Sequence, residues 1–273
     1  MNTNELLNKI ILGDCRKVLK NFPDNFFDCI CSDVPYEIVT GGVRKSKESI
    51  DKFSKTDPSG ILKRIPQNDF KRKWIKKDFD EDNAYFVGDG KLFKHCDIEF
   101  TDWLPDVYRV LKEDSHAYFM VNSRNLIKLQ TEAEKAGFKF LNLLVWVKNN
   151  ATPNKYYMQK CEFILFLRKG KAKNINNMGV TNVFNIQNII GNKYHPTEKP
   201  VELMKKLLIQ STKPNDLILD MFCGSGSTCI AAKQIGVNFI GIEIDKKYFE
   251  IANKRLSENV IIQTKNDIQL TLI

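Results

Sequence analysis

Apolar residues follow two kinds of spacing along this chain: short compact runs alternate with segments in which they recur every three or four positions. A compact run predicts a buried strand, and the wider spacing predicts an amphipathic helix. We therefore predict strands at 10–12, 26–32, 116–121, 140–147, 163–167, 217–221 and 238–242. We predict helices at 16–20, 102–111, 125–136, 200–212, 228–235 and 246–256, with Gly137 as the cap of the third.

This alternation predicts an α/β fold with a mostly parallel, twisted sheet and helices on both faces. The strands at 140–147 and 163–167 follow each other closely enough to be antiparallel neighbours. A chain of 273 residues fits one large domain with insertions, and we treat 1–273 as a single catalytic domain. Sheets of this kind bind ligands at the carboxyl ends of their strands, so we expect the functional residues there.

Residues 41–95 depart from this rhythm, because they are polar, carry Pro58, Gly60 and Pro66, and show no clear periodicity. A connection of this length in a compact domain is either functional or disordered. Interleaved aromatic residues argue against full disorder, and basic residues crowd the segment: Lys63, Arg64, Lys71, Arg72, Lys73, Lys76 and Lys77. We predict that 41–95 is a basic, DNA-facing insertion, with a solvated loop as the alternative.

The formal charge of +9 indicates a polyanionic partner, although a general lysine bias would give the same sign. A second basic stretch runs from Lys148 to Lys173, with Glu162 as its one acidic residue. The seven cysteines show no paired CxxC spacing, so we expect reduced, structural thiols and no metal site. No apolar run approaches the roughly 20 residues of a membrane span, and the start lacks a signal peptide, which predicts a cytoplasmic protein.

The first candidate for chemistry follows the predicted strand 26–32 and consists of Asp33, Val34, Pro35 and Tyr36. An exocyclic base amine is a poor nucleophile until its two N–H groups are accepted by hydrogen-bond acceptors. Asp33 offers a carboxylate for one of them, and the carbonyl of Val34 can accept the other, since Pro35 biases Val34 toward extended geometry. Tyr36 can stack on the base, as pockets for flipped bases require.

The second candidate is a glycine turn between the strand that ends at Asp220 and the helix 228–235. It contains Phe222, Gly224 and Gly226, and the acidic Glu243 follows roughly 20 residues later, where it can accept ribose hydroxyls. Such a turn admits a cofactor to the backbone, and it also fits a nicotinamide-binding fingerprint. The third glycine of that fingerprint is missing, and Asp220 is more typical of methyltransferases.

The order of these motifs resembles that of the β-class DNA amino-methyltransferases, which use S-adenosylmethionine (SAM) to methylate adenine N6 or cytosine N4. The family pattern Asp/Asn/Ser-Pro-Pro-Tyr is matched at 33–36, with Val34 in place of a proline. The resemblance implies that Asp14 meets the SAM adenine amine and that 195–200, with His195, Thr197 and Lys199, closes over the methionine end. It also implies a Rossmann-like SAM-methyltransferase fold with a circularly permuted motif order.

The implied activity is site-specific methylation of a flipped base in double-stranded DNA, and Asp33 at the first motif position favours adenine N6. Cytosine N4 is the alternative, and a catalytically decayed DNA-binding protein or a nicotinamide oxidoreductase are rivals from other classes. The short segment 168–195 is the family position for target recognition. A homodimer and a cognate restriction endonuclease are further partners to test, in a bacterial or phage-encoded cytoplasmic enzyme without metal or membrane.

Overall fold

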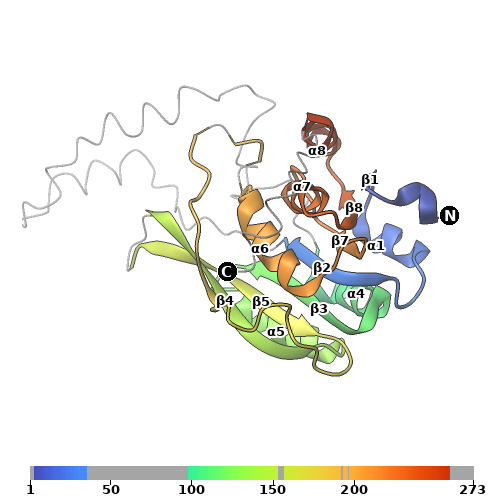
Figure 1. The fold of residues 1–273 in the computed structure, drawn as a ribbon, viewed down its shortest axis with the longest axis horizontal. Coiled ribbons are helices and arrows are strands. Elements are labelled where there is room, and N and C mark those ends of the chain that lie inside the picture. The colour runs from blue at the N-terminus through green and yellow to red at the C-terminus, as the bar shows by residue number, and fades with distance from the viewer. Residues whose placement is uncertain (1–2, 36–97, 153–156, 192, 196, 259–273) are drawn as a thin grey trace, which may run out of the picture. The chain divides into compact units, whose positions relative to one another are not determined.

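The computed structural model describes residues 3–35, 98–152, 157–191, 193–195 and 197–258 (Figure 1). The chain divides into two compact units, residues 1–35 with 99–273, and residues 36–98. The first unit carries both motif strands. Tyr36 and the predicted insertion 41–95, with all its basic residues, lie outside the described residues.

Within the described residues, eight strands form one sheet in the order β1-β8-β7-β2-β3-β5-β4-β6. All neighbouring pairs are parallel except β3–β5 and β5–β4, so β5 is the strand that runs against the others. The strands are β1 Lys9–Leu12, β2 Phe27–Asp33, β3 Leu111–Val121, β4 Lys139–Thr152, β5 Gln159–Arg168, β6 Val183–Asn185, β7 Leu217–Asp220 and β8 Asn238–Glu243. The prediction of a mostly parallel sheet is confirmed.

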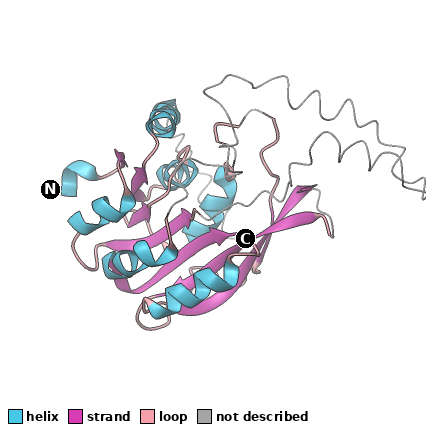
Figure 2. Cartoon of the chain, turned by 180° about the vertical axis from the view of Figure 1, so that it is seen from behind, coloured by secondary structure: helices cyan, strands magenta, loops and turns pink. Residues whose placement is uncertain are grey.

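Helices cover both faces of this sheet (Figures 1 and 2). The helices α6 Val201–Ser211, α7 Ser227–Gln234 and α8 Lys246–Glu258 pack in sequence on one face. The other face carries α1 Cys15–Val18, α4 Leu104–Val110 and α5 Leu126–Lys135. Short 3-10 turns complete the fold at Thr3–Leu6, Leu19–Asn21 and Phe100–Asp102.

The strand side chains alternate between two apolar layers, because successive residues of a strand point to opposite faces. Cys29 and Cys31 of β2 belong to the layer beneath α6 and α7, together with Met204. Phe119 of β3 faces the other way and packs edge-to-face on Trp103. The sheet is therefore buried on both sides, as expected of parallel strands.

Several predicted boundaries need correction. The predicted helix 102–111 is a 3-10 turn followed by α4, whose first turn contains Pro105, a residue suited to a helix start. The strand predicted at 116–121 begins at Leu111, and the two predicted antiparallel strands are longer than their apolar runs. The strand β6 was not predicted, since three residues carry too little pattern. Helix α5 ends where predicted, because Ala136 is its C-cap and Gly137 follows with φ of +111°.

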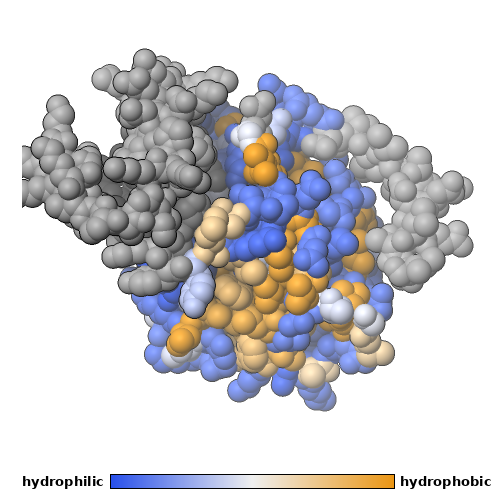
Figure 3. Space-filling view, turned by 90° about the vertical axis from the view of Figure 1, so that its left-hand side faces the viewer, coloured by the Kyte–Doolittle hydropathy of each residue, from blue (hydrophilic) through white to orange (hydrophobic). Residues whose placement is uncertain are grey.

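The surface of the described unit mixes apolar and hydrophilic side chains (Figure 3). Tyr157 and Met158, which precede β5, are among the most exposed large apolar residues, at 89% and 62%. Cysteines 15, 29, 31, 223 and 229 are buried free thiols, as predicted, whereas Cys161 is exposed. Among the described helices, none is long and apolar enough to cross a membrane.

Candidate active site

Asp33 is the last residue of β2, at the carboxyl edge of the sheet. The backbone N–H of Val34 still donates to the carbonyl of Met120 on β3, at 3.3 Å. Pro35 has no N–H to continue this pairing, so the chain leaves the sheet immediately after the carboxylate. The predicted acceptor is thus placed at the strand end where α/β folds bind ligands.

The carboxylate of Asp33 is held from one side by Lys199. Oδ2 of Asp33 accepts a hydrogen bond from Nζ of Lys199 at 2.6 Å, and no hydrogen bond from a described residue reaches Oδ1. The Lys199 side chain is only 7% exposed, whereas that of Asp33 is 25% exposed. Burial raises the pKa of Asp33 above its ordinary value, and the lysine opposes this shift.

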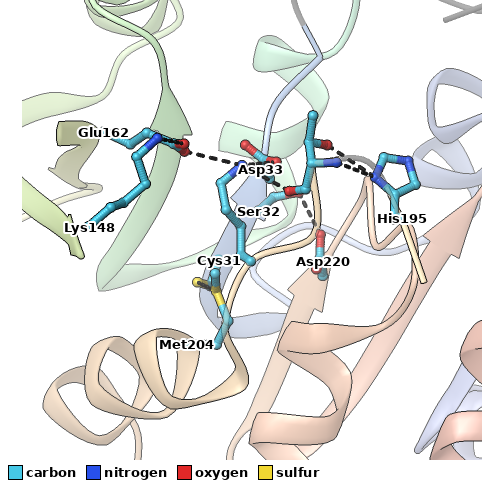
Figure 4. Close-up of polar contacts among 10 residues, drawn as sticks. Cys31, Ser32, Asp33, Lys148, Glu162, His195, Met204 and Asp220 are labelled. Atoms are coloured by element: carbon cyan, nitrogen blue, oxygen red, sulfur yellow. Dashed lines mark hydrogen bonds and ion pairs between the residues drawn. The ribbon is translucent and has the colours of Figure 1, made fainter. Parts of the chain in front are cut away.

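Lys199 also pairs with Glu162 of β5, which in turn pairs with Lys148 of β4 (Figure 4). Nζ of Lys199 lies 3.4 Å from Oε2 of Glu162, and Nζ of Lys148 lies 3.0 Å from Oε1. Burial raises the pKa of Glu162, but the two lysines outweigh it and leave that pKa below its usual value. Four side chains of alternating charge therefore run from β4 to the end of β2.

The glycine turn follows β7 as predicted. Gly224 and Gly226 have φ values of +50° and +84°, which side chains with a Cβ rarely adopt. The N–H of Gly224 donates to Oε2 of Glu243 at 2.7 Å, and the N–H of Asp245 donates to Oε1 at 2.8 Å. Glu243 thus sits against the turn at the end of β8, and burial raises the pKa of its carboxyl.

A hydrogen bond joins the two motifs directly. Ser32, the residue before Asp33, donates from Oγ to Oδ1 of Asp220 at 2.6 Å. The N–H of Phe222 lies 3.2 Å from both acceptors, Oγ of Ser32 and Oδ1 of Asp220. Asp220 is almost fully buried, and this burial raises its pKa to about 6. Its carboxylate contacts Ser32 and the backbone of the turn. Its predicted contact with the cofactor remains a prediction.

The segment around His195 borders the glycine turn. A Cβ added at Gly224 would meet the His195 ring at 3.9 Å, with nothing closer, so the turn faces open space limited by that ring. Nδ1 of His195 accepts from the N–H of Thr197 at 3.2 Å, and the ring packs against Tyr248. Burial lowers the pKa of His195 to about 4, so the imidazole is neutral at neutral pH.

Asp14 lies at the start of α1, beyond the end of β1. Its carboxylate accepts from the N–H of Arg16 at 2.9 Å and pairs with the guanidinium of the same residue at 2.6 Å. The hydrogen bond from Arg16 lowers the pKa of Asp14. Asp14 is therefore an ionised helix cap beside Glu243, since β1 and β8 are paired with Leu12 opposite Glu243.

These residues fit SAM at the strand ends of β7, β8 and β1. The turn presents backbone without side chains, and the Glu243 carboxylate has further lone pairs that could accept from ribose hydroxyls. Leu12 and Ile244 are each 45% exposed beside that carboxylate and offer apolar contact for a planar adenine. His195, Thr197 and Lys199 come together in the loop before α6, where Nζ of Lys199 donates to the carbonyl of Thr197 and to Asp33.

Two lysines of the second basic stretch are buried inside the protein. Lys148 is buried in its pair with Glu162, and Lys169 is buried where its Nζ donates to Asn25 and to the carbonyl of Leu111. Neither of these two ammonium groups is presented to solvent. In the described part of the chain, no group of three or more His, Cys, Asp and Glu side chains is arranged to hold a metal ion.

Sequence reasoning missed the residues that connect the motifs. Ser32, Glu198 and Arg255 form the hydrogen bonds and ion pairs that hold the loops together, and Glu162 was seen only as an isolated acid in a basic stretch. That isolation was the available signal, because a carboxylate among lysines is a natural partner for a buried cation. The residue spacing gave no sign of the other three.

The sheet order, with the glycine turn after β7 and Asp33 at the end of β2, is that of a Rossmann-like SAM-methyltransferase fold. Comparison with known proteins agrees, because the family model described as DNA methylase matches residues 27–254. The chain belongs to this N6/N4 DNA methylase family and is a SAM-dependent DNA amino-methyltransferase. The nicotinamide alternative is thereby set aside.

Individual relatives support the same assignment. The chain is 30% identical to Type II methyltransferase M.HinfI of Haemophilus influenzae, over 98% of this chain and 73% of that protein. The solved M1.HpyAVI–SAM complex has a TM-score of 0.60 and 24% identity, covering 90% of this chain and 98% of that one. The PvuII DNA methyltransferase, described as cytosine-N4-specific, has a TM-score of 0.62 and 14% identity, covering 96% and 90%. These two structures match the fold.

Proposed function

We propose that this enzyme methylates N6 of adenine in double-stranded DNA, with the flipped adenine held by Asp33, the Val34 carbonyl and Tyr36. The observation that carries the proposal is the Ser32–Asp220 hydrogen bond of 2.6 Å. This bond joins Ser32, the residue before the proposed amine acceptor Asp33, to Asp220, the last residue of β7, after which the glycine turn begins. Methyl acceptor and methyl donor are then bound at neighbouring strand ends, as a direct transfer requires.

The chemistry forms one N–C bond, breaks the methyl–sulfur bond of the sulfonium, whose electron pair stays on sulfur as a neutral thioether leaves, and releases one N–H proton. Bound SAM supplies an electrophilic methyl group on its sulfonium. Asp33 accepts one N–H of the amine through the oxygen that Lys199 leaves unoccupied, and this localises the nitrogen lone pair. After transfer the amine carries a positive charge, and the ionised Asp33 both stabilises that charge and accepts the departing proton. Much of the acceleration is orientation.

Cytosine N4 is the second candidate, because a structure of similar fold is described as cytosine-N4-specific. Asp33 at the first position of the motif favours adenine. Val34 in place of a proline keeps the carbonyl that the chemistry uses, so this departure does not argue for a decayed site.

The test is methyl transfer from SAM to duplex DNA, followed by mass spectrometry of the nucleosides. We expect N6-methyladenine, and N4-methylcytosine would overturn the base assignment. Asp33→Ala should abolish transfer while SAM binding by calorimetry persists. Asp24→Ala is the matched control, because its carboxylate is 68% exposed and surface ion pairs contribute little. Near-normal turnover in Asp33→Ala would refute the acceptor role.

Recognition of DNA is proposed for the insertion 41–95 and for the segment 168–195. In the second segment β6 extends the sheet beside β4, and the side chain of Asn176 donates to the carbonyls of Ile209 and Thr212. We further propose cytoplasmic action in a bacterial or phage-infected cell, as a homodimer, beside a cognate restriction endonuclease. Sedimentation of the enzyme with and without duplex DNA tests the dimer.

A further inference from the structure

We propose that Glu162 is a positioning residue for Asp33, acting through Lys199 and held in place by Lys148; this inference rests on the proposed function. The two carboxylates differ in how many of their oxygens are occupied. Both oxygens of Glu162 face a lysine, whereas Asp33 uses only Oδ2 among the described residues. Each oxygen of Glu162 thus already pairs with a lysine, whereas Oδ1 of Asp33 accepts no hydrogen bond from a described residue.

The two lysine side chains are more deeply buried than the two carboxylates. The side chains of Lys148 and Lys199 are 9% and 7% exposed, and those of Glu162 and Asp33 are 29% and 25% exposed. Lys148 is further confined by Trp146, whose ring centroid lies 5.8 Å from Nζ. Glu162 stands opposite Trp146 in the β4–β5 pairing, so two paired strands fix this outer ion pair.

Lys199 is shared between the two carboxylates, at 2.6 Å from Asp33 and 3.4 Å from Glu162. A lysine that interacts with two anions neutralises each of them less completely than it would one. Glu162 thus limits how strongly Lys199 binds Asp33, and Lys148 limits how strongly Glu162 draws on Lys199. The arrangement holds Asp33 through Oδ2 while it limits how far Lys199 neutralises the charge of that carboxylate.

Other charged and titratable groups near these four side chains come from the surrounding elements. Lys193 and His195 lie on the same loop as Lys199, and both interact electrostatically with it. Asp220 of β7 carries a further carboxylate that interacts electrostatically with Asp33. None of these three belongs to the ion pairs that Glu162 forms with Lys148 and Lys199, so the outer pair can be altered while they remain.

The proposal predicts shifts of opposite sign for the outer residues. Burial places the pKa of Asp33 above its ordinary value, and methyl transfer requires the ionised form, so the rate falls as pH falls through that pKa. This fall in rate is the acid limb of the pH profile. Glu162→Gln removes an anion and should move the acid limb to lower pH. Lys148→Met leaves Glu162 with Lys199 as its one lysine partner among the described residues, so Lys199 neutralises Asp33 less and the acid limb should move to higher pH. Lys199→Met should move it further in the same direction, by about one pH unit or more.

The experiment is single-turnover methylation of duplex DNA at saturating SAM, measured across pH for the full chain and each variant. Because Lys148 acts on Asp33 only through Glu162, the double variant Glu162→Gln/Lys148→Met should show the same acid limb as Glu162→Gln alone. Glu202→Gln is the control, since it removes a carboxylate from an exposed pair with Lys206 at 3.9 Å and should leave the limb unchanged. Circular dichroism and SAM calorimetry establish that each variant is folded.

The expected result is opposite shifts in Glu162→Gln and Lys148→Met, with the double variant matching Glu162→Gln. Equal positions of the limb in all three would overturn the proposal and leave Glu162 and Lys148 as a purely structural ion pair. Glu162→Gln is close in shape to the native residue, so it decides the question even if Lys199→Met fails to fold. Absence of methyl transfer by the unaltered chain would overturn the proposed function itself, and the inference with it.

Discussion

Arg255 and Glu198 form a buried ion pair of 2.8 Å between Nη2 and Oε1, which ties α8 to the loop before α6. The same guanidinium donates through Nη1 to the carbonyl of Ser225, at 2.7 Å, inside the glycine turn. The other carboxylate oxygen of Glu198 accepts from the N–H of Tyr194 at 2.8 Å. One arginine thus fixes both sides of the proposed SAM site relative to each other.

We expect Arg255→Met to destabilise the protein and to weaken SAM binding by tenfold or more. The substitution leaves Glu198 buried without its cation, a change that costs about 3–5 kcal/mol in comparable buried pairs. Urea unfolding and calorimetry with SAM measure the two effects. The double variant Arg255→Met/Glu198→Met should recover part of the stability, because no unpaired charge is then buried, without recovering SAM affinity. Equal losses of stability in the single and double variants would contradict this explanation.

The two turn glycines should differ in their response to alanine. At Gly226 a Cβ would approach the Cβ of Ala252 to 3.1 Å, in addition to the strain of φ at +84°. At Gly224 the nearest atom is 3.9 Å away, so the strain, of about 1–2 kcal/mol, is the main cost. Thermal unfolding should show Gly226→Ala as the less stable variant. SAM affinity should fall strongly in Gly224→Ala as well, since its new methyl enters the open space beside His195.

Asp220 should make the protein less stable as pH rises. Its pKa of about 6 in the folded state lies above the ordinary value near 3.9, so between these values the folded state binds a proton that the unfolded state has lost. Stability therefore falls as pH increases through this window, by on the order of 3 kcal/mol from this group.

Asp220→Asn should remove that contribution. Free energies of unfolding of the native chain and the variant, measured at a series of pH values from 4 to about 7, should converge at the acidic end and diverge toward neutral pH. Parallel curves would show that Asp220 is ionised throughout.

The basic residues of the insertion should contribute to DNA binding through interactions with phosphates. Replacing Arg72, Lys73, Lys76 and Lys77 with alanine should weaken DNA binding and flatten its dependence on salt, by about one unit of log–log slope for each phosphate interaction that is removed. SAM affinity should not change. Fluorescence anisotropy of labelled duplex DNA across salt concentrations measures the slope. An unaltered slope would transfer the role to exposed residues near β5, where Tyr157 and Met158 stand beside Lys160.

The sequence by itself determined the order of strands and helices, the parallel sheet and both motif strands. These follow from local signals, because an apolar run that ends in Asp33 or in the 222–226 turn predicts a buried strand and its end from a few consecutive residues. It also placed Gly224 and Gly226 in a turn that needs left-handed backbone, which the φ values confirm. Strand ends were less accurate where pairing extends beyond the apolar residues, as in β3 and β4.

Only the tertiary structure decided which charged side chains meet. Lys199 and Asp33 are 166 positions apart, and Ser32 and Asp220 are 188 apart, so no spacing relates them. The sheet order places β2 next to β7, so Ser32 and Asp220 meet. It also pairs β5 with β4, so Glu162 and Lys148 meet and Lys199 from the loop before α6 joins them. Lysines that looked alike in the sequence became buried partners or surface charges because burial depends on neighbours that the chain supplies from elsewhere.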